Sequence, residues 1–147
     1  MAVTRRIALV GVALIGLSLI PIPYLASPAW EVSVVDDTGQ PVQGVTVRLS
    51  YQNYSAERHS HEENRTTDER GQATFPRWES SASLLELCYY SGLSARAGVH
   101  ASFGRHAGVF VFGHGLDGTA TSGRFVTDWT GSPDHMESRI VLTAQRR

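Results

Sequence analysis

The chain has 147 residues, of which 41% are hydrophobic and 18% are charged, and its formal net charge at pH 7 is −1. This size and balance suit one ordinary globular domain. With 13 Lys and Arg residues against 14 Asp and Glu residues and no basic run, the composition lacks the positive surface that a nucleic-acid-binding protein needs. The single cysteine, Cys88, excludes an intrachain disulfide and a zinc site built on several cysteines, and we expect it to be a small buried residue.

The N-terminal segment has the pattern of an export signal. Arg5 and Arg6 precede a stretch over residues 7–29 that carries no charge, and small residues at Ser27 and Ala29 fit a cleavage after Ala29. The pattern predicts a signal peptide over residues 1–29, or a membrane anchor through residues 7–25, because about 20 apolar residues span a bilayer. Either way the arginines stay inside, and a domain over residues 30–147 is exported to the periplasm or the cell exterior.

Two strands are predicted at the start of this exported part. They cover Trp30–Asp36 and Val45–Tyr51. In the second segment Val45, Val47 and Leu49 alternate with polar residues, which is the period-2 pattern of a strand with one buried face.

A polar connection and a short hairpin should follow. The segment Gln52–Asn64 is polar and is expected to be an exposed connection. Arg65–Thr67 and Gln72–Phe75 are predicted to pair as a hairpin around the turn Asp68–Gly71.

The segment Ser81–Gly92 fits either a helix or a strand. Ser83 and Glu86 have the spacing of a capping box, and Gly92 suits the position just after a helix. The alternating apolar residues of the segment fit a strand as well. We favour a short helix inserted between strands.

The last part of the chain is predicted to be β-structure. Ala107–Phe112 is apolar at successive positions, which is typical of a central strand covered on both faces. Gly113–Gly118 should be a turn, Gly123–Trp129 an edge strand and Glu137–Ala144 the final strand. The fold class predicted is all-β: a single sandwich with one short helical insert, preceded by an N-terminal hydrophobic helix.

Two segments carry a family resemblance. Val34–Leu49 and Thr66–Pro76 resemble the carboxypeptidase regulatory-like domains, which are prealbumin-like, or transthyretin-like, β-sandwiches. The resemblance covers Glu31–Pro76, whereas between Arg77 and Trp129 the chain departs from the family pattern. It implies a non-catalytic exported binding or structural module of the cell envelope, without a cofactor, whose partner is an envelope protein or a small ligand.

The alternative is a small metalloenzyme or hydrolase on a transthyretin-like sandwich. Transthyretin-like hydroxyisourate hydrolases have a histidine in the first strand, and Trp30–Asp36 has none. His59 and His61 form a His-x-His pair like the iron ligands of intradiol dioxygenases, but the pair precedes Asp68–Phe75 instead of following it. Because acidic residues surround both histidines in a polar segment, we expect them to be solvated and predict no metal site.

A second group of polar residues flanks the predicted central strand. Histidines near carboxylates can transfer protons, and an indole can stack on a sugar ring or another flat ligand. The same residues could instead bond loop backbone or cap the core. The candidate binding residues are His100, Arg105, His106, Asp128 and Trp129, in a wider cluster with His114 and Asp117.

Overall fold

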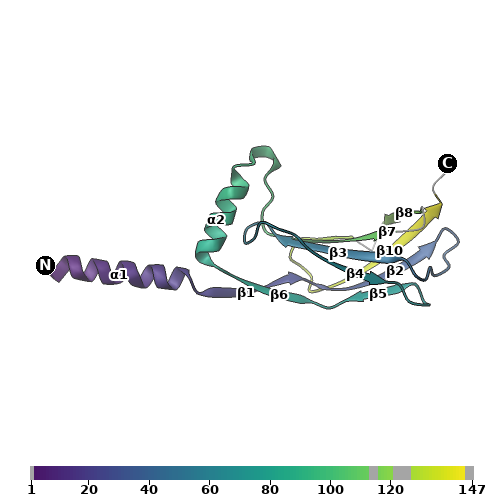
Figure 1. Ribbon diagram of the computed structural model, residues 1–147, viewed down its shortest axis with the longest axis horizontal. Coiled ribbons are helices and arrows are strands. Elements are labelled where there is room, and N and C mark those ends of the chain that lie inside the picture. Colours follow the sequence, from purple (N-terminus) through teal and green to yellow (C-terminus); the bar gives the residue numbers. More distant parts are fainter. Residues whose placement is uncertain (1, 113–115, 121–126, 145–147) are drawn as a thin grey trace.

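The computed structural model describes residues 2–112, 116–120 and 127–144, which form mostly β-structure (Figure 1). Within these residues, two four-stranded sheets pack on one core, with strand orders β5-β2-β10-β8 and β4-β3-β7-β9, and β1 and β6 form a separate two-stranded ribbon. The strands are β1 Pro21–Ser27, β2 Ala29–Asp36, β3 Thr46–Asn53, β4 His61–Thr66, β5 Gln72–Phe75, β6 Trp78–Ser83, β7 Arg105–Phe112, β8 Leu116–Ala120, β9 Asp128–Trp129 and β10 His135–Ala144. The helices are α1 Ala2–Ser18, α2 Leu84–Ala95 and a short 3-10 turn at Gly98–His100. The prediction of an all-β sandwich with few helices is confirmed.

The core lies between the two four-stranded sheets. Val45, Val47 and Leu49 are all buried in it, so the predicted alternation before and along β3 is confirmed. Trp30 enters from the facing sheet, and its Nε1 donates a hydrogen bond to Ser138 Oγ at 2.9 Å. A buried indole N–H needs such an acceptor, so this bond fixes the ring within the core.

The centre of one sheet is a parallel pair of strands from opposite ends of the domain. β2 and β10 pair in register from Ala29 opposite His135 to Asp36 opposite Leu142. The predicted final strand over Glu137–Ala144 is confirmed and begins two residues earlier.

The predicted hairpin around Asp68–Gly71 is wrong. β4 pairs with β3 and β5 pairs with β2, so the two strands belong to different sheets. The turn itself is present, because the Asp68 carboxylate accepts hydrogen bonds from the N–H groups of Arg70 and Gln72 and Gly71 has a positive φ of 70°. A local turn signal reverses the chain, but it does not specify which neighbour each strand joins.

β7 is an inner strand of its sheet, as predicted, but only one of its faces is covered. Ala107 and Val109 are buried, whereas Phe110 and Phe112 are 49% and 48% exposed on the outer face. The successive apolar residues therefore supply the core on one side and exposed rings on the other.

Two predictions after β7 fall partly on described residues. Residues 116–118 lie in β8 instead of a turn, and residues 113–115 lie outside the described part. Of the edge strand expected over residues 123–129, the described portion contains β9, which pairs with β7.

The predicted helix is α2, and its start is as expected. Ser83 caps it, with Ser83 Oγ accepting from the Glu86 N–H at 3.2 Å and the Glu86 carboxylate accepting from the Ser83 N–H at 2.7 Å. The predicted end at Gly92 is wrong, because the helix continues to Ala95. Cys88 was expected to be buried but is exposed on α2.

The N-terminal segment contains a strand that the sequence did not reveal. β1 follows α1 closely and pairs with β6, from Pro21 opposite Ser83 to Ser27 opposite Trp78. Ala26 and Ser27 at its end are buried. In the described ranges, no helix combines the length and the apolar character needed to cross a membrane.

Candidate functional site on the outer face of the β4-β3-β7-β9 sheet

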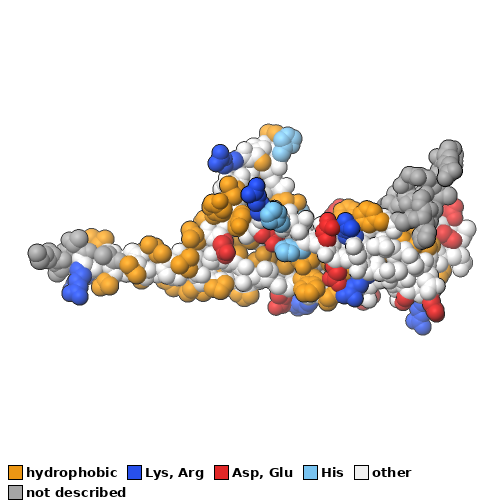
Figure 2. All heavy atoms as spheres, viewed as in Figure 1, with side chains coloured by type: hydrophobic (Ala, Val, Ile, Leu, Met, Phe, Trp, Pro, Cys, Tyr) orange, Lys and Arg blue, Asp and Glu red, His pale blue; other side chains and the backbone are white. Residues whose placement is uncertain are grey.

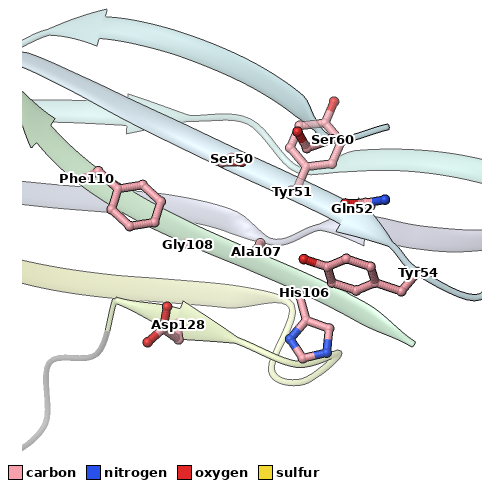
Figure 3. Close-up of a pocket in the computed structure, with 10 residues that line it drawn as sticks. All are labelled: Ser50, Tyr51, Gln52, Tyr54, Ser60, His106, Ala107, Gly108, Phe110 and Asp128. Carbon is pink, nitrogen blue, oxygen red and sulfur yellow. The ribbon is translucent and has the colours of Figure 1, made fainter. Parts of the chain in front are cut away.

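The outer face of this sheet carries a hollow of about 260 Å³ at the end of β3 and the start of β7 (Figure 3). Ser50 of β3 and Gly108 of β7 are register partners, and Gly108 also pairs with Asp128 of β9. Three neighbouring strands therefore place one small residue, one glycine and one carboxylate side by side. The lining residues are Ser50, Tyr51, Gln52, Tyr54, Ser60, His106, Ala107, Gly108, Phe110 and Asp128.

Gly108 keeps the centre of this hollow open. A Cβ atom at this position would lie 3.2 Å from Asp128 Oδ1, 3.3 Å from the Thr127 carbonyl oxygen and 3.5 Å from Phe110 Cε2. With a side chain here, the Asp128 carboxylate and the backbone just before β9 would have to shift by a few tenths of an ångström. The space between Phe110 and Asp128 thus depends on the missing side chain.

His106 forms the wall nearest the sheet end. Its Nε2 lies 3.1 Å from the Phe103 carbonyl oxygen, and its ring meets Tyr54 edge-on with centroids 5.3 Å apart. Because a carbonyl oxygen can only accept, Nε2 carries the hydrogen of this bond.

Tyr51 lies beside the hollow, and its ring is surrounded by ionisable side chains. Its ring stacks on His61 with centroids 5.2 Å apart, and His61 Nε2 lies 2.6 Å from Glu57 Oε2. Burial and the nearby carboxylates of Glu63 and Glu57 raise the pKa of Tyr51. Its hydroxyl therefore stays protonated at neutral pH and can donate a hydrogen bond.

The two histidines of the His-x-His pair have different surroundings. His61 is committed to Glu57 and Tyr51, and His59 lies in the preceding exposed connection. Across the described residues there is no group of three or more His, Cys, Asp or Glu side chains that could hold a metal ion.

A second hollow, of about 480 Å³, lies between the connection after β3 and helix α2. It shares Gln52 and Tyr54 with the first hollow, and on the helix side it is lined by Tyr89, Tyr90, Leu93 and Ser94. Ser94 Oγ donates a hydrogen bond to the Tyr54 carbonyl oxygen at 3.0 Å. Tyr54 is therefore the residue that links the sheet face to the helix.

The structure separates the predicted binding residues into three places. His106 and Asp128 line the first hollow. Arg105 and Trp129 belong to the other side of their strands: Arg105 Nη1 donates to the Leu25 carbonyl oxygen at 3.3 Å, and its guanidinium lies 5.7 Å from the centroid of the buried Trp129 ring. His100 is exposed beyond α2. Successive strand residues point to opposite faces, so neighbours in sequence cannot all serve one surface.

The side chains of two members of the wider cluster are not described. His114 lies outside the described residues, and for Asp117 only the backbone position in β8 is described.

Sequence reasoning missed the β3 side of the hollow. Ser50 and Gln52 were recognised only as the polar half of an alternating strand. In the structure they share a face with the alternate positions of β7, which include His106 and Phe110. What the sequence did not supply was the pairing of β3 with β7.

No family model matches the chain, and no curated protein matches it. Among solved structures, the chain is similar to 3-chlorocatechol 1,2-dioxygenase from Rhodococcus opacus 1CP, with a TM-score of 0.45, 14% identity, and coverage of 82% of this chain and 61% of that chain. It is also similar to a mutant of catechol 1,2-dioxygenase from Acinetobacter radioresistens, with a TM-score of 0.45, 12% identity, and coverage of 84% of this chain and 53% of that chain. The chain thus spans less than two thirds of the length of these structures. At this score the likeness carries no conclusion about activity.

Proposed function

We propose that the chain is a non-catalytic binding or structural β-sandwich module of the cell envelope, exported and held at the membrane by α1. The observation that carries the proposal is that the exposed apolar helix α1 leads directly into β1, a strand of the folded unit. α1 has 17 residues, about 25 Å of helix, and its apolar side chains from Ile7 onward are largely exposed. An exposed apolar helix of this length finds its favourable surroundings in the acyl region of a bilayer.

The position of β1 favours retention of this segment over its removal. Cleavage after Ala29 would take away β1, although Ser27 is buried and β1 pairs with β6 along its length. It would also remove the bond from the Ala29 N–H to the Asp134 carbonyl oxygen, at 3.0 Å, and the Leu25 carbonyl that Arg105 contacts. These contacts argue that the folded unit begins before residue 30, and they therefore disfavour cleavage after Ala29.

The resemblance to carboxypeptidase regulatory-like domains supports a non-catalytic role, because such modules present ligands or support other domains. The geometry of His106 and Asp128 supports it too. Their backbone positions are separated by two residues along β7 and one strand spacing, roughly 8 Å. None of the described contacts joins the two side chains into a hydrogen-bonded pair such as a catalytic triad contains, and His106 Nε2 instead contacts the Phe103 carbonyl oxygen.

The hollow is the part of the module that we assign to ligand binding. Hydroxyl, amide, imidazole and carboxylate groups surround the exposed ring of Phe110. This combination suits a small polyhydroxylated ligand whose flat face stacks on the ring while its edges form hydrogen bonds. The alternative ligand is an envelope protein that offers the hollow a segment with the same combination of a flat face and hydrogen-bonding groups.

Membrane attachment can be tested by fractionating cells that produce the full chain. We expect the chain to remain in the membrane pellet after alkaline carbonate washing, and Ile15→Asp in α1 to release it, because a charge in the acyl region is costly. Gln43→Asp, on an exposed turn, adds the same charge and should change nothing. A wild-type chain that carbonate releases would contradict the tether.

The hollow can be tested with a panel of mono- and disaccharides, followed by amide chemical shifts. We expect shifts confined to the residues that line the hollow, on β3, β7, β9 and the connection after β3, which are lost in Phe110→Ala and kept in Phe112→Ala. The two rings have almost equal exposure on the same face, but only Phe110 lines the hollow. A hydrolytic activity that disappears in His106→Ala would contradict the non-catalytic role.

A further inference from the structure

Helix α2 leaves several large apolar side chains exposed to solvent. Its half-buried positions recur with helical spacing on the side that faces the sandwich, and they include Tyr90 and Ser94. None of its residues is buried. Among its large apolar side chains, Leu85 is 53% and Tyr89 is 60% exposed, and Tyr89 also lines the second hollow. The outward face comprises Leu85, Cys88, Gly92 and Arg96, with Tyr89 and Leu93 at its border with the second hollow.

The helix is held firmly in this orientation. At its start the capping box of Ser83 and Glu86 ties it to the end of β6. Near its end Ser94 Oγ bonds the Tyr54 carbonyl oxygen. Two fixed points about three turns apart leave the outward face no way to rotate onto the sandwich.

The start of α2 lies beside the end of α1. Pro21, the first residue of β1, is the register partner of Ser83, the residue that caps α2. In Figure 1, α1 continues the line of β1 away from the sandwich, and α2 stands across that line. Figure 2 shows hydrophobic side chains along α1, over the start of β1 and on the side of α2 that faces α1. One apolar surface therefore continues from α1 to α2.

The charges on α2 fit an anionic surface. The carboxylate of Glu86 is turned back onto the Ser83 N–H and hydroxyl, at 2.7 and 2.9 Å, so it does not face outward. Arg96 stands at the opposite end of the outward face. Basic residues are attracted to anionic headgroups, and tyrosine rings are enriched at the membrane–water boundary.

From these observations we infer that α2 lies along the surface of the bilayer that receives α1, with its outward face in the headgroup–acyl boundary. The inference rests on the proposed tether and extends it: α1 enters the acyl region of the bilayer, and α2 lies along the bilayer surface. The module then has two contacts with the membrane and a fixed orientation above it. A second copy of the chain is the competing occupant, but a protein partner on α2 alone would leave the continuous apolar surface of α1 unexplained.

Cys88 is the only cysteine in the chain and lies on the outward face, so it can carry a single environment-sensitive fluorophore. The full chain is labelled there and reconstituted into vesicles of phosphatidylcholine and phosphatidylglycerol at 3:1. We expect a blue-shifted emission, a several-fold weaker quenching by aqueous iodide, and strong quenching by doxyl-labelled lipid. The same label on Asp37→Cys in a Cys88→Ser background, at the exposed turn after β2, should remain fully open to iodide.

A paired substitution tests the face itself. Leu85→Ser with Tyr89→Ser should restore iodide quenching at Cys88, whereas Phe112→Ser, which removes an apolar group of similar exposure on the sandwich, should not. Vesicle flotation distinguishes a failure of the inference about α2 from a failure of the proposed tether by α1. If the chain floats but the Cys88 label stays open to iodide, the inference about α2 is overturned and the tether stands; if it does not float, both are overturned. Protection from iodide without quenching by doxyl lipid would show a second copy or another protein on α2, and would overturn the bilayer assignment.

Discussion

Replacing Leu49 with alanine tests the packing of the two sheets at its centre. Leu49 is 0% exposed, and its register partners are Val109 on one side and Glu63 on the other. Its side chain enters the core between the sheets. Its neighbour Ser50 points the opposite way, into the outer-face hollow.

The expected cost follows from this burial. Leu→Ala substitutions in a closed core lower the free energy of unfolding by about 2–5 kcal/mol, because apolar contact is lost and a cavity remains. Domains of this size have total stabilities of about 5–15 kcal/mol. With a slope of about 1.5 kcal/mol per molar urea, a loss of about 3 kcal/mol lowers the unfolding midpoint by about 2 M.

Tryptophan fluorescence during urea unfolding of the full chain measures this shift. Trp30 and Trp129 are buried and report on the core, whereas Trp78 is 42% exposed and contributes a constant background. Ser50→Ala is the matched control, because it changes the next residue of the same strand on the outer face and should alter stability by no more than about 0.5 kcal/mol. Equal midpoints for Leu49→Ala and Ser50→Ala would refute the assignment of the two faces.

Three further predictions concern single contacts. Ser138→Ala should lower the free energy of unfolding by about 1–3 kcal/mol, because it removes the acceptor of the buried Trp30 Nε1–H; calorimetry of the variant measures this. The Thr38 hydroxyl and the Gln40 and Thr38 N–H groups lower the pKa of Asp36, so Thr38→Val should raise that pKa and Thr38→Ser should not, as carboxyl chemical shifts during a pH titration will show. The N–H and hydroxyl of Ser83 also lower the pKa of Glu86. The carboxylate's contribution to α2 is therefore present above the ordinary glutamate pKa and lost as the pH falls through the lowered value. An acidic loss of helical circular dichroism should follow, and it should be absent in Glu86→Gln, which keeps a capping side chain that does not titrate.

Patterns that act within a few residues predicted local structure well. The alternation of Val45, Val47 and Leu49 identified the buried face of β3, and the spacing of Ser83 and Glu86 identified the start of α2. Both signals depend on side-chain direction or on one hydrogen bond, so the local sequence suffices.

Long-range pairing was the part that the sequence did not determine. The assignment of β4 and β5 to different sheets depends on partners distant along the chain, and no turn residue specifies them. β1 was hidden for another reason: its apolar residues fit an export segment equally well. The hollow was found only in part, because His106 was evident as a polar residue but its neighbours come from β3.

The retained α1–β1 segment is the central claim, and the intact mass of the chain recovered from the membrane fraction tests it most directly. We expect a mass that includes residues 1–29. A chain that begins at Trp30 and is recovered without the membrane would contradict it.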